Sequence, residues 1–132
     1  MKTIIVTGAS DGVGKASAIA MGKAGFKVIL VARNEEKLKN VSSQIKNSDY
    51  FICDICDKTQ IEKTIKEIHK KHGKIDILFN NAGRWIQGEL DENSVSDIED
   101  TINTDLTGHI LMTKAVIPIM KKQKSGLLIY LI

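Results

Sequence analysis

Three glycines near the amino terminus have a spacing that could bind phosphate. Gly8, Gly12 and Gly14 follow a short apolar strand and precede an alanine-rich helix. Glycine has no Cβ, so it can adopt positive φ and let a ligand approach the backbone closely. The start of the helix directs free N–H groups and the positive end of its dipole at this turn, which makes an anion site.

A strand, a glycine turn and a helix start in this order predict a site for the pyrophosphate of a dinucleotide. The alternative is a tight turn between strand and helix that binds no ligand. The residues expected to contact the dinucleotide here are Thr7, Gly8, Ser10, Asp11, Gly12, Val13 and Gly14.

A basic residue after the second predicted strand indicates which dinucleotide is favoured. A carboxylate there would accept hydrogen bonds from the ribose 2′-hydroxyl of NAD and would repel a 2′-phosphate. This chain instead has Ala32 followed by Arg33 and Asn34, and a guanidinium offers a fork of donors to phosphate. We therefore predict NADP rather than NAD, with Arg33 and Asn34 among the contacts. The alternative is that Arg33 is a solvated loop residue.

The elements that must position these residues alternate along the chain. Apolar runs predict strands over residues 3–6, 27–32, 50–53, 75–80 and 126–132, and helical spacing predicts helices over about 13–24, 34–45, 57–73 and 96–120. Such alternation predicts an α/β fold, with a parallel sheet and helices on both faces. We find no repeat or linker, so residues 1–132 are expected to form one dinucleotide-binding domain.

Local signals predict how these helices begin, end and pack. The predicted N-caps are Asn34, Asp57 and Ser96, the last two as capping boxes with Gln60 and Glu99. Gly25 and Gly73 are predicted helix ends, while Ala16, Ala20 and Ala24 are expected to lie close to the sheet. Gly108, inside the last helix, is expected to mark close packing or a backbone approach, and Pro118 to fall near that helix's end.

Two further segments complete a pattern that resembles a known family. Asp54 and Ile55 follow the third predicted strand, and Asn80-Asn81-Ala82-Gly83 follows the fourth. Together with the glycine turn, and in this order at strand ends, they resemble the coenzyme-binding part of short-chain dehydrogenases/reductases over the whole chain. The resemblance implies a Rossmann-like doubly wound parallel sheet of about five strands in the order 3-2-1-4-5.

The resemblance also implies roles for these residues. Asp54, with Ile55 beside it, matches the acid that hydrogen-bonds the adenine amino group, although an ordinary turn aspartate is the alternative. Asn80 matches an asparagine that steadies the sheet, and Ala82 and Gly83 match backbone that lies along the cofactor. Asp11 argues against NADP, since NADP-preferring relatives often carry a basic residue there.

The same resemblance places most of the catalytic residues beyond this sequence. In the family, a Tyr with a Lys four residues later is the general acid/base, and a Ser holds the substrate oxygen; all three would follow the fifth strand. The chain is therefore expected to be truncated before the last strands and inactive alone. Asp105 occupies the family's Asn position, three residues before Gly108. It is the candidate catalytic residue here, or an ordinary polar helix residue.

The spacing of Cys53, Cys56, His69 and His72 is close to that of a Cys2His2 zinc finger. The ligand types suit zinc, but the spacing of the histidines is one residue short, and polar residues occupy the places of the finger's small core. A redox role for the Cys-x-x-Cys lacks a matching context. We therefore predict no metal site.

Composition limits the class of protein. With 132 residues, 42% apolar residues and a net charge of +3, the chain is long enough for one core, and its spread lysines give no reason to expect nucleic acid or a membrane as partner. No apolar run approaches the roughly 18 residues of a membrane span, and the apolar start is too short for a signal peptide. We expect a cytoplasmic protein with reduced thiols.

Two hypotheses follow for its function. One is an NADP-dependent oxidoreductase that transfers hydride between a nicotinamide and a small carbonyl or alcohol substrate, of which this chain is the coenzyme-binding part. The other is a non-catalytic NADP-binding module that acts through a partner. In both, an unpaired fifth strand at the sheet edge invites association, so a homo-oligomer is expected.

Overall fold

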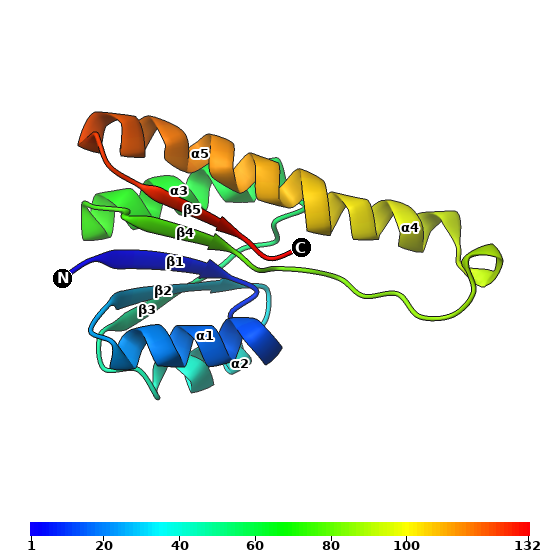
Figure 1. The fold of residues 1–132 in the computed structure, drawn as a ribbon, viewed down its shortest axis with the longest axis horizontal. Coiled ribbons are helices and arrows are strands. Elements are labelled where there is room, and N and C mark those ends of the chain that lie inside the picture. Colours follow the sequence, from blue (N-terminus) through cyan, green and yellow to red (C-terminus); the bar gives the residue numbers. More distant parts are fainter.

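The computed structural model describes residues 1–132 as one five-stranded parallel sheet with helices on both faces (Figure 1). The strands are β1 (Thr3–Thr7), β2 (Lys27–Ala32), β3 (Ser48–Ile52), β4 (Ile77–Asn80) and β5 (Leu127–Tyr130), in the order β3-β2-β1-β4-β5. The helices are α1 (Gly12–Lys23), α2 (Glu35–Ser42), α3 (Lys58–His72), α4 (Val95–Ile102) and α5 (Gly108–Gln123). A 3-10 turn, η1 (Leu90–Glu92), precedes α4, and a π-helical turn, η2 (Asn103–Thr107), joins α4 to α5. The predicted fold class and strand order are confirmed.

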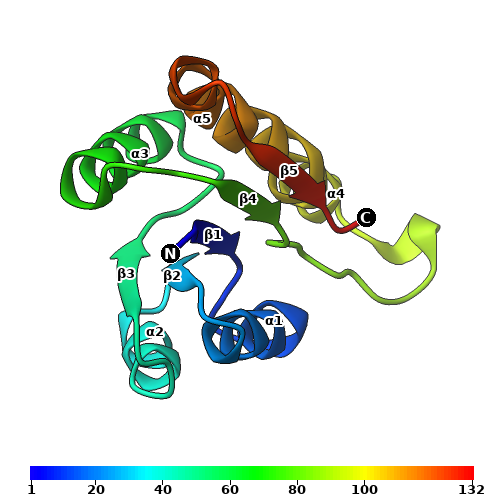
Figure 2. The same ribbon diagram turned by 60° about the vertical axis from the view of Figure 1, so that its left-hand side comes forward.

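Two apolar layers hold the helices to the sheet, because successive strand residues point to opposite faces. Ile4 and Val6 of β1 pack in the layer under α1 and α2. Ile5 packs in the other layer, with residues of α3 and α5 such as Ile65 and Met112. Figure 2 shows α1 and α2 on one side of the sheet and α3 and α5 on the other. Both faces of β1 are fully covered, as its continuous apolar run requires.

Several predicted helix ends are confirmed. Asn34 Oδ1 accepts from the N–H of Lys37, and Asp57 Oδ1 accepts from the N–H groups of Thr59 and Gln60. The Gln60 side chain does not close the box on the Asp57 N–H; its Oε1 accepts from the Asp54 N–H instead. Gly25 and Gly73 have positive φ just past α1 and α3, as expected of helix stops.

Other details of the prediction are wrong. Ser94, not Ser96, caps α4 and accepts from the Asp97 N–H, because the sequence offers two Ser-x-x-acid patterns two residues apart and the chain uses the first. The fourth strand begins at Ile77 and not at residue 75, whose N–H donates to Gln123 Oε1. The third strand spans Ser48–Ile52, two residues earlier at its start than predicted.

The packing of two helices differs from expectation as well. Ala16, Ala20 and Ala24 are exposed, and the buried residues of α1 are Gly14 and Ala18. The α5 helix continues past Pro118 to Gln123. Gly108 is confirmed as a point of close packing: a Cβ there would lie 2.8 Å from Ile55 Cδ1 and 3.0 Å from the Ile55 carbonyl oxygen.

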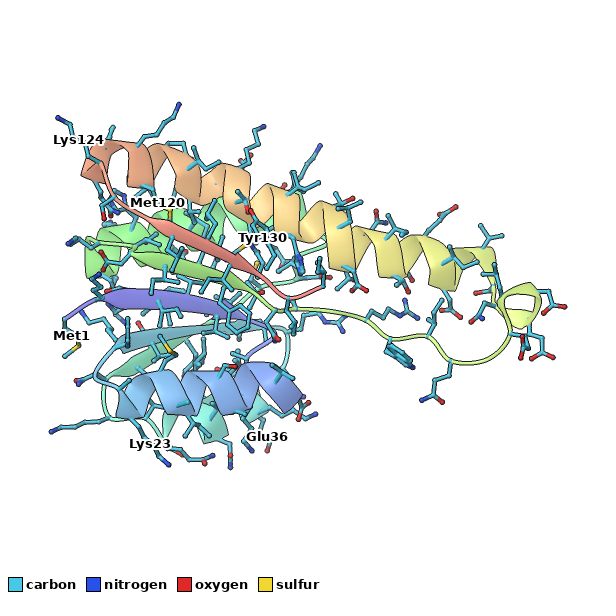
Figure 3. All side chains as sticks on the ribbon, in the orientation of Figure 1. Met1, Lys23, Glu36, Met120, Lys124 and Tyr130 are labelled. Atoms are coloured by element: carbon cyan, nitrogen blue, oxygen red, sulfur yellow. The ribbon has the colours of Figure 1, made fainter.

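Apolar side chains are left exposed along α4 and α5 and at the edge strand β5. The helix residues form a stripe at roughly helical spacing, which we call the α4–α5 stripe: Val95, Ile102, Leu106, Ile110 and Ile117. Leu127, Ile129 and Tyr130 of β5 are exposed beside it, and Figure 3 shows Tyr130 near the end of that strand. No helix of the structure is both long and apolar enough to cross a membrane.

Candidate dinucleotide-binding site

The predicted cofactor residues meet at one edge of the sheet. All five strands are parallel, so their carboxyl ends, and the segments that follow them, lie at the same side of the molecule, which is on the right in Figure 1. β1 lies between β2 and β4, which means that the chain leaves β1 in one direction and returns on the other side. In open α/β sheets, ligands bind at this switch point. The glycine turn follows β1 at that point.

The glycine turn has the shape of an anion cradle. Gly8 has φ of +63° and Gly12 of +53°, which side chains with a Cβ rarely adopt. A Cβ on Gly14 would overlap the Gly8 carbonyl oxygen and the Asn81 side-chain amide, so this position must be glycine. No atom lies within 4 Å of a Cβ built on Gly12, so the space above the turn is open.

The start of α1 supplies donors to this cradle. The first backbone hydrogen bond of the helix runs from the Lys15 N–H to the Asp11 carbonyl oxygen, so the N–H groups of Gly12, Val13 and Gly14 have no acceptor within the helix. The N-cap residue Asp11 makes no side-chain hydrogen bond to them. Three free amides beside an open turn with glycine at positions 8, 12 and 14 fit a diphosphate.

Thr7 holds the cradle to the segment after β4. Its Oγ1 accepts from the N–H groups of Asn81 and Ala82, both at 3.0 Å. The Asn81 side-chain amide in turn donates to the carbonyl oxygens of Thr7 and Gly8. Thr7 is fully buried, so its hydroxyl aligns two pieces of backbone and does not face a ligand.

The buried His109 fixes the same segment from the helical side. The distance from His109 Nε2 to the Ala82 carbonyl oxygen is 2.6 Å. A carbonyl oxygen can only accept, so the proton of His109 is on Nε2. Asn80, fully buried at the end of β4, donates to Thr113 Oγ1, which also contacts the Tyr130 hydroxyl at 2.6 Å. Asn80 therefore joins β4 to α5 and β5.

Two basic residues, Arg33 and Lys37, lie on the segment after β2 and at the start of α2. Arg33 follows β2, is exposed, and makes no hydrogen bond or ion pair within the chain. Lys37 on α2 donates to Asp11 Oδ2 at 2.7 Å. Asn34 uses its side-chain oxygen to cap α2, so its remaining donors are those of its amide nitrogen and backbone.

Asp54 and Ile55 lie on the loop after β3. Asp54 Oδ1 accepts from the Cys56 N–H, a turn-type hydrogen bond, while its Oδ2 accepts none within the chain. Ile55 is buried and its side chain faces the core beside Gly108. Only the backbone of Ile55 is thus available to a ligand.

Asp105 lies in η2 and holds the residue after Gly83. Its Oδ1 accepts from the Arg84 N–H at 2.6 Å. The Arg84 guanidinium donates to Asp100 at 2.9 Å and to Asp97 at 2.6 Å. These hydrogen bonds, Asp100 first and Asp97 second, raise the pKa of Arg84 above its usual value. Three acids of α4 and η2 thereby anchor the loop that follows Gly83.

The cysteine and histidine side chains of the zinc-finger pattern do not cluster into a metal-binding group. Cys53 is buried, where loss of hydration raises the pKa of its thiol, while Cys56 is exposed and 3.2 Å from Thr104 Oγ1. His72 is hydrogen-bonded to Asp49 at 2.9 Å. No three His, Cys, Asp or Glu side chains lie close enough to bind a metal ion.

Sequence reasoning did not select Lys37, Asn81, Arg84 or His109 as site residues. Lys37 carries a recognisable signal, since a cation in the first turn of a helix opposes the helix dipole and needs a reason to be there. The roles of Asn81 and His109 could not be predicted, because their partners are backbone carbonyls that only the folded sheet brings near.

This chain is similar to members of one protein family. The family model for short chain dehydrogenases matches residues 2–132. An uncharacterised oxidoreductase of Staphylococcus aureus strain USA300 is 32% identical over 130 residues, which cover 97% of this chain and 56% of that protein. The chain thus spans little more than half the length of this relative.

Solved structures agree with this match. A short-chain dehydrogenase from Streptomyces avermitilis superimposes with a TM-score of 0.90 at 31% identity, covering 96% of this chain and 47% of that one. A metagenomic short-chain oxidoreductase in complex with NADP gives a TM-score of 0.90 at 32% identity, covering 96% and 60%. This chain therefore belongs to the short-chain dehydrogenase family.

Proposed function

We propose that the chain binds NADP and forms the coenzyme-binding part of an oxidoreductase that acts on a carbonyl or alcohol. The observation that carries this is the row of free amides at Gly12, Val13 and Gly14 after β1, together with the unpaired guanidinium of Arg33 after the neighbouring strand β2. One solved relative of the same fold holds NADP, which supports the choice of cofactor.

Most of the predicted residues have a part in this proposal. The amides of the glycine turn would hold the diphosphate, Arg33 and Asn34 the adenosine side, and the free oxygen of Asp54 the adenine. Ala82 and Gly83 would place their backbone along the cofactor. A bound dinucleotide would donate hydride to a carbonyl or accept it from an alcohol, and the chain would orient the dinucleotide. Asp105 would act as a positioning residue, since its carboxylate is already bound to the Arg84 N–H.

Calorimetry tests the proposal. We expect the folded chain, verified by circular dichroism, to bind NADPH more tightly than NADH. The substitution Arg33→Ala should lower the affinity for NADPH about tenfold while changing that for NADH little, because the guanidinium would contact only the 2′-phosphate. Exposed Lys63 on α3 offers a matched control, Lys63→Ala, that removes one positive charge elsewhere. No heat with either dinucleotide would refute the proposal.

We expect the whole protein to have the oxidoreductase activity of its family. We expect residues 1–132 alone to have no such activity. The family's Ser, Tyr and Lys have no counterpart among them: Tyr130 lies within β5 and its hydroxyl contacts Thr113. NADPH binding without carbonyl reduction is therefore the expected result. That result also fits the second hypothesis, a non-catalytic module, so a longer chain with reductase activity is needed to separate the two.

Two further expectations belong to this proposal. The exposed α4–α5 stripe and the free edge of β5 support a homo-oligomer, since both offer surface that a second copy would cover. The cytoplasmic location expected from the sequence is the second expectation.

A further inference from the structure

The glycine turn carries an acidic residue that works against the proposed cofactor. Asp11 lies between Gly8 and Gly12, and 69% of its side chain is exposed. A 2′-phosphate carries close to two negative charges at neutral pH. An uncompensated carboxylate beside such a group would repel it.

The Asp11 carboxylate is turned away from the start of α1. Aspartate at an N-cap commonly accepts from the N–H groups of the first turn. Here the Asp11 side chain accepts none of them, and its Oδ2 accepts from Lys37 Nζ at 2.7 Å. The ion pair both neutralises Asp11 and leaves the amides of the turn to a ligand.

Lys37 connects the two segments of the proposed site. Its N–H donates to Asn34 Oδ1 at 3.0 Å, next to Arg33, while its Nζ reaches the glycine turn. The hydrogen bond from the Ala9 N–H to the Val31 carbonyl oxygen, 3.4 Å, holds the turn beside the end of β2. Figure 3 shows Lys23 and Glu36 at opposite ends of this helical layer, so the first turn of α2 lies where α1 begins.

We propose that Lys37 determines cofactor specificity: by pairing with Asp11 it allows this site to accept the 2′-phosphate of NADP. This inference rests on the proposed function and adds a residue to it. Without Lys37 the carboxylate would face the phosphate unscreened, and preference would move toward NAD, which has a hydroxyl at that place.

A double-mutant cycle read by calorimetry tests the pair. The substitutions are Lys37→Met, Asp11→Asn and both together, each titrated with NADPH and NADH. Lys37→Met should weaken NADPH about tenfold and change NADH less than about twofold. Asp11→Asn should strengthen NADPH, and in its presence Lys37→Met should cost less than about threefold, because the charge that Lys37 neutralises is gone.

Lys39→Met is the matched control, since Lys39 is on the same helix, is 60% exposed and pairs with Glu35 instead. It should leave the NADPH-to-NADH ratio unchanged. An equal effect of Lys37→Met on both dinucleotides, or the same loss with and without Asp11, would overturn this inference while leaving dinucleotide binding intact. If the folded wild-type chain bound neither dinucleotide, the proposed function would be refuted, and the role proposed for Lys37 would be refuted with it.

Discussion

At the scale of single residues, the site depends on side chains that bind backbone. Thr7, Asn81, His109 and Asp105 each hold a main-chain N–H or carbonyl group at the carboxyl edge of the sheet. Such bonds align the glycine turn with the segment after β4 before any ligand arrives. Substituting one of these side chains leaves a poorly solvated backbone group without a hydrogen-bond partner. We therefore expect substitutions at these positions to destabilise the fold.

Asp105 gives the clearest test of this anchoring. Asp105→Ala should lower the free energy of unfolding by about 1–2 kcal/mol, because the Arg84 N–H loses its acceptor. Asp105→Asn should recover most of that loss, since an amide oxygen accepts equally well in place of the carboxylate. Urea denaturation of the three chains measures it. Equal losses for both variants would show that the negative charge, not the hydrogen bond, is what matters.

Asp49, on the edge strand β3, makes a pH-dependent contribution to the stability of the fold. Burial opposes ionisation of its carboxylate, but hydrogen bonds from Lys71 at 2.7 Å and His72 at 2.9 Å outweigh it, so the pKa of Asp49 lies below its ordinary value of 3.8. A carboxylate with a lowered folded-state pKa stabilises the fold above its unfolded-state pKa, and the contribution disappears as the pH falls through the folded-state value.

Asp49→Asn should therefore lower the free energy of unfolding by about 1 kcal/mol at neutral pH. The difference from wild type should shrink as the pH falls below 3.8, where the native carboxylate begins to protonate. Urea denaturation at a series of pH values measures this. A difference that stayed constant down to the lowest pH would contradict the role given to the ion pairs.

At the scale of elements, helix α5 approaches the loop after β3 through Gly108. Alanine favours helix by about 1 kcal/mol over glycine, but here its Cβ would lie 2.8 Å from Ile55 Cδ1 and 3.0 Å from the Ile55 carbonyl oxygen. The steric cost is the larger effect, because one of the two contacts is with backbone that cannot rotate away.

Gly108→Ala should thus destabilise the chain by about 1–3 kcal/mol in spite of its helix propensity. Ile55→Val removes Cδ1, so the double variant should recover part of the loss. Thermal unfolding followed by circular dichroism measures both. A Gly108→Ala chain that melts at or above the wild-type temperature would refute the close approach.

The elements also show what the sequence could and could not reveal. The Asn34 and Asp57 caps and the role of Gly108 were predictable because each depends on local residue type, whereas the strand order was predicted through the family resemblance. The face of α1 was predicted wrongly: three alanines at helical spacing suggested one buried side, but Gly14 and Ala18 are buried instead. Small residues tolerate either environment, so their spacing does not identify the buried face.

The same limit applies to the candidate site. Glycine spacing indicated the turn, a basic residue at a strand end indicated Arg33, and the family resemblance indicated the Asn80–Gly83 segment. The pairing of Lys37 with Asp11 joins residues 26 positions apart through side chains alone. No periodicity reports such a contact, and only the packing of α2 beside α1 creates it.

At the scale of the whole molecule, exposed apolar side chains occur along α4, η2, α5 and the edge strand β5. Ile102, Leu106 and Ile110 of the α4–α5 stripe are each more than half exposed, and β5 has no strand on its outer side. Exposed apolar stripes and unpaired strand edges both promote association.

We therefore expect sedimentation velocity to show a dimer or larger species at micromolar concentration. Ile102→Lys combined with Ile110→Lys should shift the distribution toward monomer, since charges on the stripe would have to lose water in the contact. Leu90→Lys, which changes an exposed apolar residue of η1 outside the stripe, is the control. A monodisperse wild-type monomer would contradict the expectation.

The central place of β1 has a consequence for the order in which the molecule is completed. β1 is synthesised before both of its partners, β2 at Thr3↔Lys27 and β4 at Ile4↔Ile77. Thr7 meets Asn81 and Ala82 only after both have emerged from the ribosome. A nascent chain that pauses before residue 80 therefore contains every glycine of the turn but lacks the contacts that hold the turn to the segment after β4, so the cradle is completed long after its glycines are translated.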